Sequence, residues 1–269
     1  PPYKEDKLSF HEKLYLYHSF TGFFYFIHDF KNGYVYAKKL VSLFEANKEM
    51  IYRKSEFYIR ALNNLLSAQH KMRLYNEFYE THKKLIALKR DDKFQKTKNI
   101  NLNLFKTIYI HEINRHYMLG EFTSGTRIVR KLENELENFI PILDHHTVLI
   151  FYYKIACLYF GANNFKTAIK WLNKIINERE VALREDIHSF SRIVRLISYF
   201  ELGDEELIEY SIKSTYRFLL KKGTLQQYHN LILSFLKNAK HLSTKQKQIA
   251  AFSKLKNQML ELKTSRYEK

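Results

Sequence analysis

The stretch Ile155–Ile175, IACLYFGANNFKTAIKWLNKI, decides the fold because it contains one complete helix–turn–helix unit. Tyr159 belongs to its first helix, and Asn163-Asn164 form the turn as a plausible helix breaker. The second helix is expected to bury residues spaced along one of its faces, namely Phe165, Ala168, Leu172 and Ile175. The pattern predicts two antiparallel helices that pack on each other.

Helical spacing continues on both sides of this unit, and no segment has the alternation typical of a strand. A capping box at Ser9–Glu12 opens the first helix, which we expect to reach about Phe30, and Asn32-Gly33 are expected to turn the chain into the second. The other helices are expected at about 33–50, 52–69, 71–90, 101–119, 121–138, 144–161, 164–180, 186–202, 204–221, 224–239 and 244–264. The sequence therefore predicts an all-α protein.

One position near the start of each second helix recurs along the chain, and its occupants are Ala37, Tyr75, Gly125, Ala168 and Ile208. These residues lie 38, 50, 43 and 40 positions apart, and an apolar residue follows each of them four positions later. Small residues there allow paired helices to approach closely, whereas Tyr75 and Ile208 are expected to hold their pairs further apart. An irregular helical bundle is the alternative to a repeat.

The motif at Ile155–Ile175 and this recurring position resemble the tetratricopeptide repeat (TPR) family, in a divergent form with units of about 40 residues instead of about 34. The resemblance covers residues 15–221. It implies a right-handed α-solenoid of antiparallel helix pairs, with about five pairs in residues 9–221 and capping helices in 222–269, as one continuous domain. It also implies a concave groove that holds a peptide or protein segment.

Counting back from the recurring position places Arg60, Asn64 and Asn114 on the predicted groove. An Asn amide offers donors and an acceptor to a peptide backbone. Arg60 with Asn64 is similar to part of the carboxylate clamp that some family members use for a peptide C-terminus, although Ile150 occupies one of the usual basic places of that clamp. Three aromatic residues are expected to add apolar pockets, with ordinary packing between repeats as the alternative: Tyr117, Tyr153 and Phe160.

The formal net charge of +17 is concentrated in residues 221–269, with +9, and in residues 82–99, with +5. The last helix is expected to place Ile249, Phe252, Leu255, Met259 and Leu262 on one side. Its basic residues are Lys245, Lys247, Lys254, Lys256 and Lys263. A basic amphipathic helix predicts a cap for the solenoid or, as an alternative, electrostatic binding of nucleic acid or an anionic membrane.

Signatures of catalysis and of cofactor binding are missing from the sequence, which has no Gly-rich phosphate loop. His111 and His116 are five positions apart, so on a helix they point about 140° apart and do not share a metal. Cys157 has no CxxC partner and is expected to be a buried, inert thiol. We therefore predict no enzyme, no cofactor and no metal site.

No apolar run approaches the ~18 residues of a membrane span, and the N-terminal residues lack the pattern of a signal peptide. With the single cysteine, these features predict a cytoplasmic protein, and a targeting signal in residues upstream of this sequence is an open alternative. The predicted function is a non-enzymatic scaffold that binds a protein or peptide segment. A sensor solenoid that acts on a partner, or on an effector domain outside this sequence, is the alternative.

Overall fold

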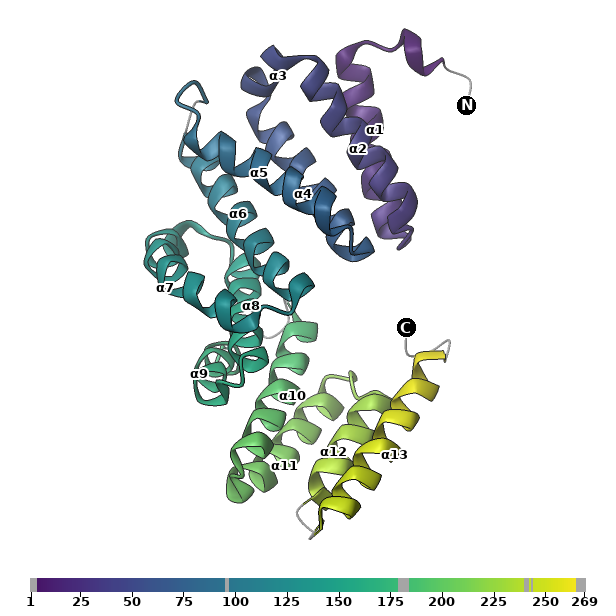
Figure 1. Cartoon of the computed structure of the whole chain (residues 1–269), viewed down its shortest axis with the longest axis vertical. Coiled ribbons are helices and arrows are strands. Elements are labelled where there is room, and N and C mark those ends of the chain that lie inside the picture. Colours follow the sequence, from purple (N-terminus) through teal and green to yellow (C-terminus); the bar gives the residue numbers. More distant parts are fainter. Residues whose placement is uncertain (1–3, 95–96, 179–183, 240–241, 243, 265–269) are drawn as a thin grey trace. The chain divides into compact units, whose positions relative to one another are not determined.

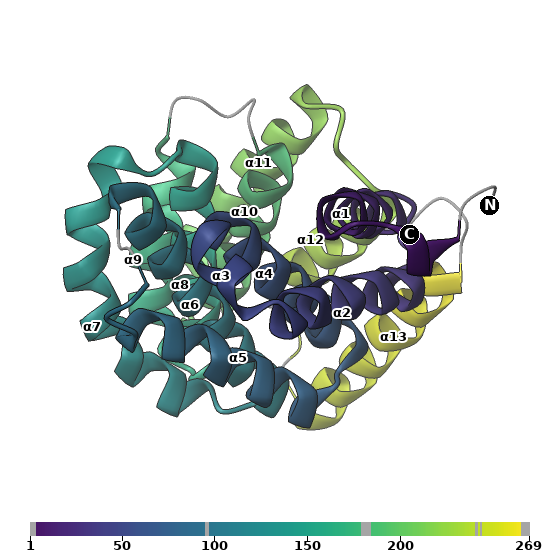
Figure 2. The same ribbon diagram turned by 90° about the horizontal axis from the view of Figure 1, so that it is seen from above.

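The computed structural model describes residues 4–94, 97–178, 184–239, 242 and 244–264, and side chains of the last helix as far as Leu262. Within these residues every regular element is a helix, joined to the next by a short connection (Figure 1, Figure 2), which confirms the all-α prediction. The α-helices are α1 (Phe10–Phe26), α2 (Phe30–Ala46), α3 (Lys48–Arg53), α4 (Ser55–Met72), α5 (Tyr75–Arg90), α6 (Lys98–Leu119), α7 (Phe122–Phe139), α8 (His145–Gly161), α9 (Phe165–Ile176), α10 (Glu185–Leu202), α11 (Glu205–Lys221), α12 (Gln227–Ala239) and α13 (Lys245–Thr264). None of the helices in these ranges combines the length and the apolar character needed to cross a bilayer.

The chain divides into two compact units, Pro1–Leu143 and Asp144–Lys269. The division falls where the helices are interrupted, because the 3-10 turn η2 (Ile140–Ile142) contains Pro141, which cannot continue an α-helix. Asp144 then opens α8, since its carboxylate accepts the backbone amide of Thr147 at 2.8 Å. Each unit has its own apolar core.

In the first unit, consecutive helices pack as the pairs α1–α2, α4–α5 and α6–α7. Phe10 at the start of α1 meets Phe44 near the end of α2, with 5.4 Å between ring centroids, so these helices run antiparallel. Helix α4 is central because it packs against α2, α5 and α6, and its Leu62 and Leu66 are 0% exposed. The short α3, which the sequence did not predict, connects α2 to α4.

In the second unit the pairs are α8–α9, α10–α11 and α12–α13, and α12 and α13 run side by side in Figure 1. The first helix of a pair also packs on both helices of the pair before it: α10 on α8 and α9, and α12 on α10 and α11. Such nearest-neighbour packing is typical of helical repeats. Trp171 of α9 is 5% exposed, and the Lys174 ammonium lies 4.0 Å from the centre of its ring.

The turns inside the pairs follow helix-end chemistry. Asn163 adopts a left-handed backbone with φ 58°, and the side chain of Asn164 accepts the backbone amide of Thr167 at 3.2 Å, so the predicted turn is confirmed. Gly120 and Gly203 end α6 and α10 with φ 69° and 70°, a conformation in which glycine meets no steric cost.

The first turn differs from its prediction, because α1 ends at Phe26 rather than near Phe30, where α2 already begins. Asp29 sets this boundary: its carboxylate accepts the backbone amide of Asn32 at 3.1 Å and the Asn32 side chain at 2.6 Å, which caps α2. Asn32 and Gly33 therefore lie in the first turn of α2 and do not form the connection. Gly33 is buried there against α1.

This correction also changes the recurring position. The fourth residue of each second helix is Gly33, Phe78, Gly125, Ala168 and Ile208, and the intervals become 45, 47, 43 and 40 residues. The first four are buried, and Ile208 is half-buried. Tyr75, which was assigned to this position from the sequence, is the first residue of α5 and is 44% exposed. The helix starts are thus more evenly spaced along the chain than the positions chosen from the sequence.

Candidate binding site

Two of the predicted groove residues, Arg60 and Asn64, lie one helical turn apart on α4. Arg60 is exposed, and its guanidinium carbon lies 5.6 Å from the centre of the Phe57 ring. Asn64 is half-buried, and its backbone carbonyl accepts the Tyr25 hydroxyl of α1 at 2.6 Å. Burial raises the pKa of Tyr25, so this hydroxyl stays a donor. This hydrogen bond holds α1 beside α4. It uses the backbone of Asn64 and does not involve its side-chain amide.

Asn114, the third predicted groove residue, is only 6% exposed. Its amide nitrogen lies 3.4 Å from Nδ1 of His111, and Nε2 of His111 lies 3.0 Å from the side-chain oxygen of Asn63 on α4. The amide therefore belongs to a buried polar contact between α4 and α6, where an unpaired polar group would be costly. We leave Asn114 out of the proposed site for this reason.

A second polar cluster surrounds Glu112 of α6. Its carboxylate oxygens lie 2.9 Å from a guanidinium nitrogen of Arg115, 3.5 Å from Nδ1 of His82 and 3.6 Å from Nε2 of His116. Burial lowers the pKa of His82, and burial together with the Arg115 charge lowers the pKa of His116, so both rings are neutral near pH 7. Within the described part of the chain, no group of three or more His, Cys, Asp or Glu side chains could hold a metal ion.

Two of the three predicted aromatic residues pack within their own helix pairs. Tyr117 and Phe160 each lie against the first residue of the following helix, with ring centroids 6.1 and 5.5 Å apart. Tyr153 is half-buried beside the apolar cluster of α8, α9 and α10, and burial raises its pKa. Cys157, one turn further along α8, is also only half-buried, which corrects the prediction of a buried thiol.

The predicted basic residues lie on α13. Four of them are exposed, namely Lys245, Lys247, Lys254 and Lys256, and the side chain of Lys263 lies outside the described residues. On the predicted apolar side, Ile249 is 57% and Phe252 is 47% exposed, although Phe252 contacts the ring of Phe235 at 4.7 Å. The other apolar residues, Leu255, Met259 and Leu262, are half-buried. The predicted apolar side of α13 is therefore only partly buried.

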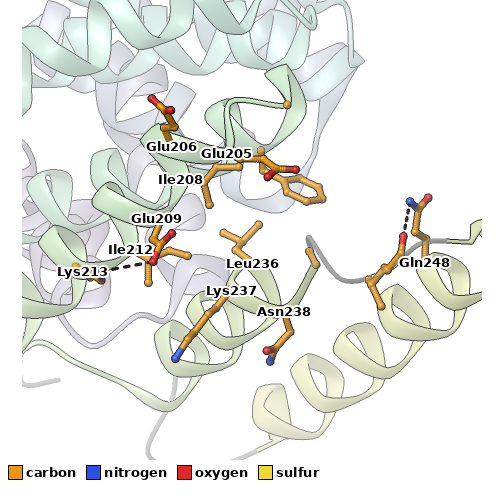
Figure 3. Close-up of a pocket in the computed structure, with 14 residues that line it drawn as sticks. Glu205, Glu206, Ile208, Glu209, Ile212, Lys213, Leu236, Lys237, Asn238 and Gln248 are labelled. Carbon is orange, nitrogen blue, oxygen red and sulfur yellow. Dashed lines mark hydrogen bonds and ion pairs between the residues drawn. The ribbon is translucent and has the colours of Figure 1, made fainter.

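The second unit also contains a pocket of about 650 Å³, where the end of α10, the first half of α11 and the end of α12 meet (Figure 3). Its apolar lining is formed by Phe200, Ile208, Ile212, Leu236, Ala239 and Leu242. At one end, the Gln248 side chain donates to the backbone carbonyl of Leu242 at 3.2 Å. The volume falls in the range of about 300–1,000 Å³ that is usual for ligand pockets.

Carboxylates line the α11 side of this pocket, at Glu205, Glu206 and Glu209, and Lys237 lies on the facing α12 side in Figure 3. Glu209 pairs with Lys213 at 3.6 Å. Neither Glu205 nor Glu206 forms an ion pair with any other residue that the structure describes. Both lie in the first turn of α11, where the partial positive charge of a helix start stabilises acidic groups without a cation. Their charge is thus available to a ligand.

Sequence reasoning did not find this pocket, although one signal pointed to it. Ile208 occupies the position that holds Gly125 and Ala168 in the two preceding pairs, and its larger side chain lines the pocket. Glu205 is also the first residue of α11, a position that an aromatic residue occupies in the second helix of each preceding pair, as Phe122 and Phe165 do. The sequence does not show that the end of α12 lies opposite these residues and forms the other side of the pocket.

Comparison with known proteins adds no assignment, because no protein-family model and no curated protein matches this sequence. The function of the pocket therefore has to be inferred from the chemistry of its own residues.

Proposed function

We propose that this chain is a non-enzymatic helical-repeat protein that binds a protein or peptide segment in the pocket between α11 and α12. The observation that carries the proposal is the combination of an apolar lining with uncompensated carboxylates on one rim. A pocket of this kind holds an apolar side chain and orients it through a few polar groups. Glu205 and Glu206 then favour a segment that has Lys or Arg next to that apolar residue.

The packing of the helices supports a repeat scaffold of the TPR-like kind, which we propose as a right-handed solenoid. In the second unit, each first helix packs on both members of the preceding pair. Arrays built in this way present extended surfaces without needing a catalytic centre. The predicted contacts Arg60 and Asn64 remain part of this proposal, as a second binding face on α4.

Binding can be measured by fluorescence anisotropy with a short labelled peptide that carries two leucines between lysine flanks. We expect saturable binding to the wild-type chain, and we expect Glu205→Lys with Glu206→Lys to weaken it about tenfold or more, which is about 1.4 kcal/mol. The reversed charges repel the lysine flanks and lie at the rim, so the effect should shrink at high salt. The matched control is Glu201→Lys, an exposed glutamate of α10 outside the pocket.

Equal affinity of the rim variant and the control would place the peptide elsewhere. In that case Arg60→Ala with Asn64→Ala tests the face of α4, because this change removes the predicted contacts of the first unit and leaves the pocket intact. The absence of saturable binding to the wild-type chain would contradict the proposal.

The exposed side of α13 supports a second candidate function, electrostatic binding of an anionic membrane or nucleic acid. Ile249 and Phe252 are about half exposed, and Lys254 and Lys256 are exposed on the same helix. Basic helices with exposed apolar residues lie in membrane interfaces. We expect vesicles with anionic lipid to bind the chain at low salt and to release it at physiological salt, and Ile249→Ser with Phe252→Ser to weaken binding. Equal sedimentation with neutral and anionic vesicles would exclude electrostatic binding of a membrane.

A further inference from the structure

Helix α10 carries two arginines, Arg192 and Arg195, on the side that packs between α9 and α11. The guanidinium carbon of Arg192 lies 3.7 Å from the centre of the Phe218 ring of α11. Arg195 donates to the side-chain oxygen of Asn173 of α9 at 2.9 Å. Both side chains are half-buried and are therefore held in place by the two neighbouring helices.

Neither of these two arginines is neutralised by a carboxylate within the described residues. Each makes a single hydrogen bond there, Arg192 to the backbone carbonyl of His188 at 3.3 Å and Arg195 to Asn173, although a guanidinium has five N–H donors. Nε of Arg195 is buried and has no partner among these residues. A half-buried positive charge without an opposite charge is costly, and two of them one turn apart repel each other.

Both guanidinium pKa values shift in the direction that this cost implies. Burial, with the added charge of Arg195, lowers the pKa of Arg192 to about 10, and burial also lowers the pKa of Arg195. The two acidic residues in the first turn of α10 pair with other cations: Glu185 accepts Lys222 at 2.9 Å, and Asp186 pairs with Arg184. The positive charges of Arg192 and Arg195 therefore lower the stability of the second unit. Such conflicts are typical of functional sites.

We propose that Arg192 and Arg195 bind an oxyanion that presents two oxygen atoms, a carboxylate or a phosphate group. The Phe218 ring lies against one face of the Arg192 guanidinium, whose edge carries five N–H donors and makes one hydrogen bond within the described residues, to His188. Arginine is suited to this task because its planar fork matches two oxygens of a carboxylate or phosphate. The site is separate from the pocket between α11 and α12, since neither arginine lines that pocket.

Isothermal titration calorimetry with inorganic phosphate, and separately with acetate, at constant ionic strength, tests this site. We expect saturable binding of at least one of the two probes to the wild-type chain, and the stronger one identifies the anion class. Arg192→Gln and Arg195→Gln should each weaken it about tenfold or more. The matched control is Arg217→Gln, an exposed arginine of α11 in the same unit, which should bind as the wild type does.

A second measurement separates a binding role from a structural one. In buffer without multivalent anions, we expect Arg192→Met to raise the thermal unfolding midpoint by about 2–4 °C, because it removes an uncompensated charge and keeps an apolar contact with Phe218. Arg217→Met should leave the midpoint unchanged. A lower midpoint for Arg192→Met would overturn the proposal, as would binding of both probes with equal affinity by the wild type and the glutamine variants, or by neither.

Discussion

The substitution Phe44→Ala is expected to lower the free energy of unfolding by about 3–5 kcal/mol. Phe44 is 0% exposed, and its ring contacts Phe10 of α1 at 5.4 Å and Tyr58 of α4 at 5.2 Å between centroids. Removing it loses the burial of an aromatic side chain and leaves a cavity where three helices meet. Because α1, α2 and α4 share this contact, the surrounding side chains cannot close the gap by a local shift.

Urea unfolding followed by far-UV circular dichroism measures this loss. The matched control is Phe26→Ala, which removes the same side chain from a position that is 84% exposed and should change the free energy of unfolding by less than about 0.5 kcal/mol. If the two variants lost the same stability, Phe44 would not be the core residue that the structure shows.

Acidification through pH 6.5 is expected to destabilise both units. Burial lowers the pKa of His82 and of His116 in the first unit and of His188 in the second from the usual 6.5, and these rings are 3%, 3% and 0% exposed. A histidine with a lowered pKa binds a proton more readily in the unfolded chain. Its contribution is therefore fully present above pH 6.5 and is lost as the pH falls below that value.

The charges that face these rings do not reverse the sign. Glu112 opposes the shift at His82 and His116, but burial and Arg115 outweigh it. At His188, burial acts with Arg192, Lys222 and His145, and only Asp186 opposes them. Each unit of lowered pKa is worth about 1.4 kcal/mol at a pH below both values.

The measurement is the urea midpoint as a function of pH between 7.5 and 5, in which His82→Gln and His116→Gln should reduce the dependence. The carboxylates whose pKa values are lowered, such as Glu5 and Asp186, lose their contribution below about pH 5, so they fall outside this window. A constant midpoint across the range would contradict the prediction.

The helices were predictable from sequence because local chemistry decides them. The pair α8–α9 appears as expected, since Asn163 and Asn164 supply both the left-handed residue and the cap. The first turn was misplaced because two turn signals compete there, and the Asp29 cap prevails over Asn32-Gly33. Glycine at position 33 is buried inside α2 and does not form a turn, which a sequence alone does not distinguish.

The candidate site was less predictable, because it depends on contacts between distant segments. Asn114 was assigned to the groove by its spacing, but it is only 6% exposed, and its neighbour His111 contacts Asn63 of α4. The pocket depends on the end of α12 lying opposite Glu205 and Ile208, and Arg192 depends on the α11 ring that covers it. Spacing within a helix carries no information about these partners.

The burial of Trp171 gives the protein a natural spectroscopic probe. The chain has one tryptophan, so the intrinsic emission of its indole reports only on the second unit, while circular dichroism reports on the helices of both. Coincident transitions by the two signals would mean that the units unfold as one cooperative system. If the transitions were separate, Trp171 emission would report the effect of Arg192→Met on the second unit. The midpoint of that emission would then not change with Phe44→Ala, which lies in the first unit.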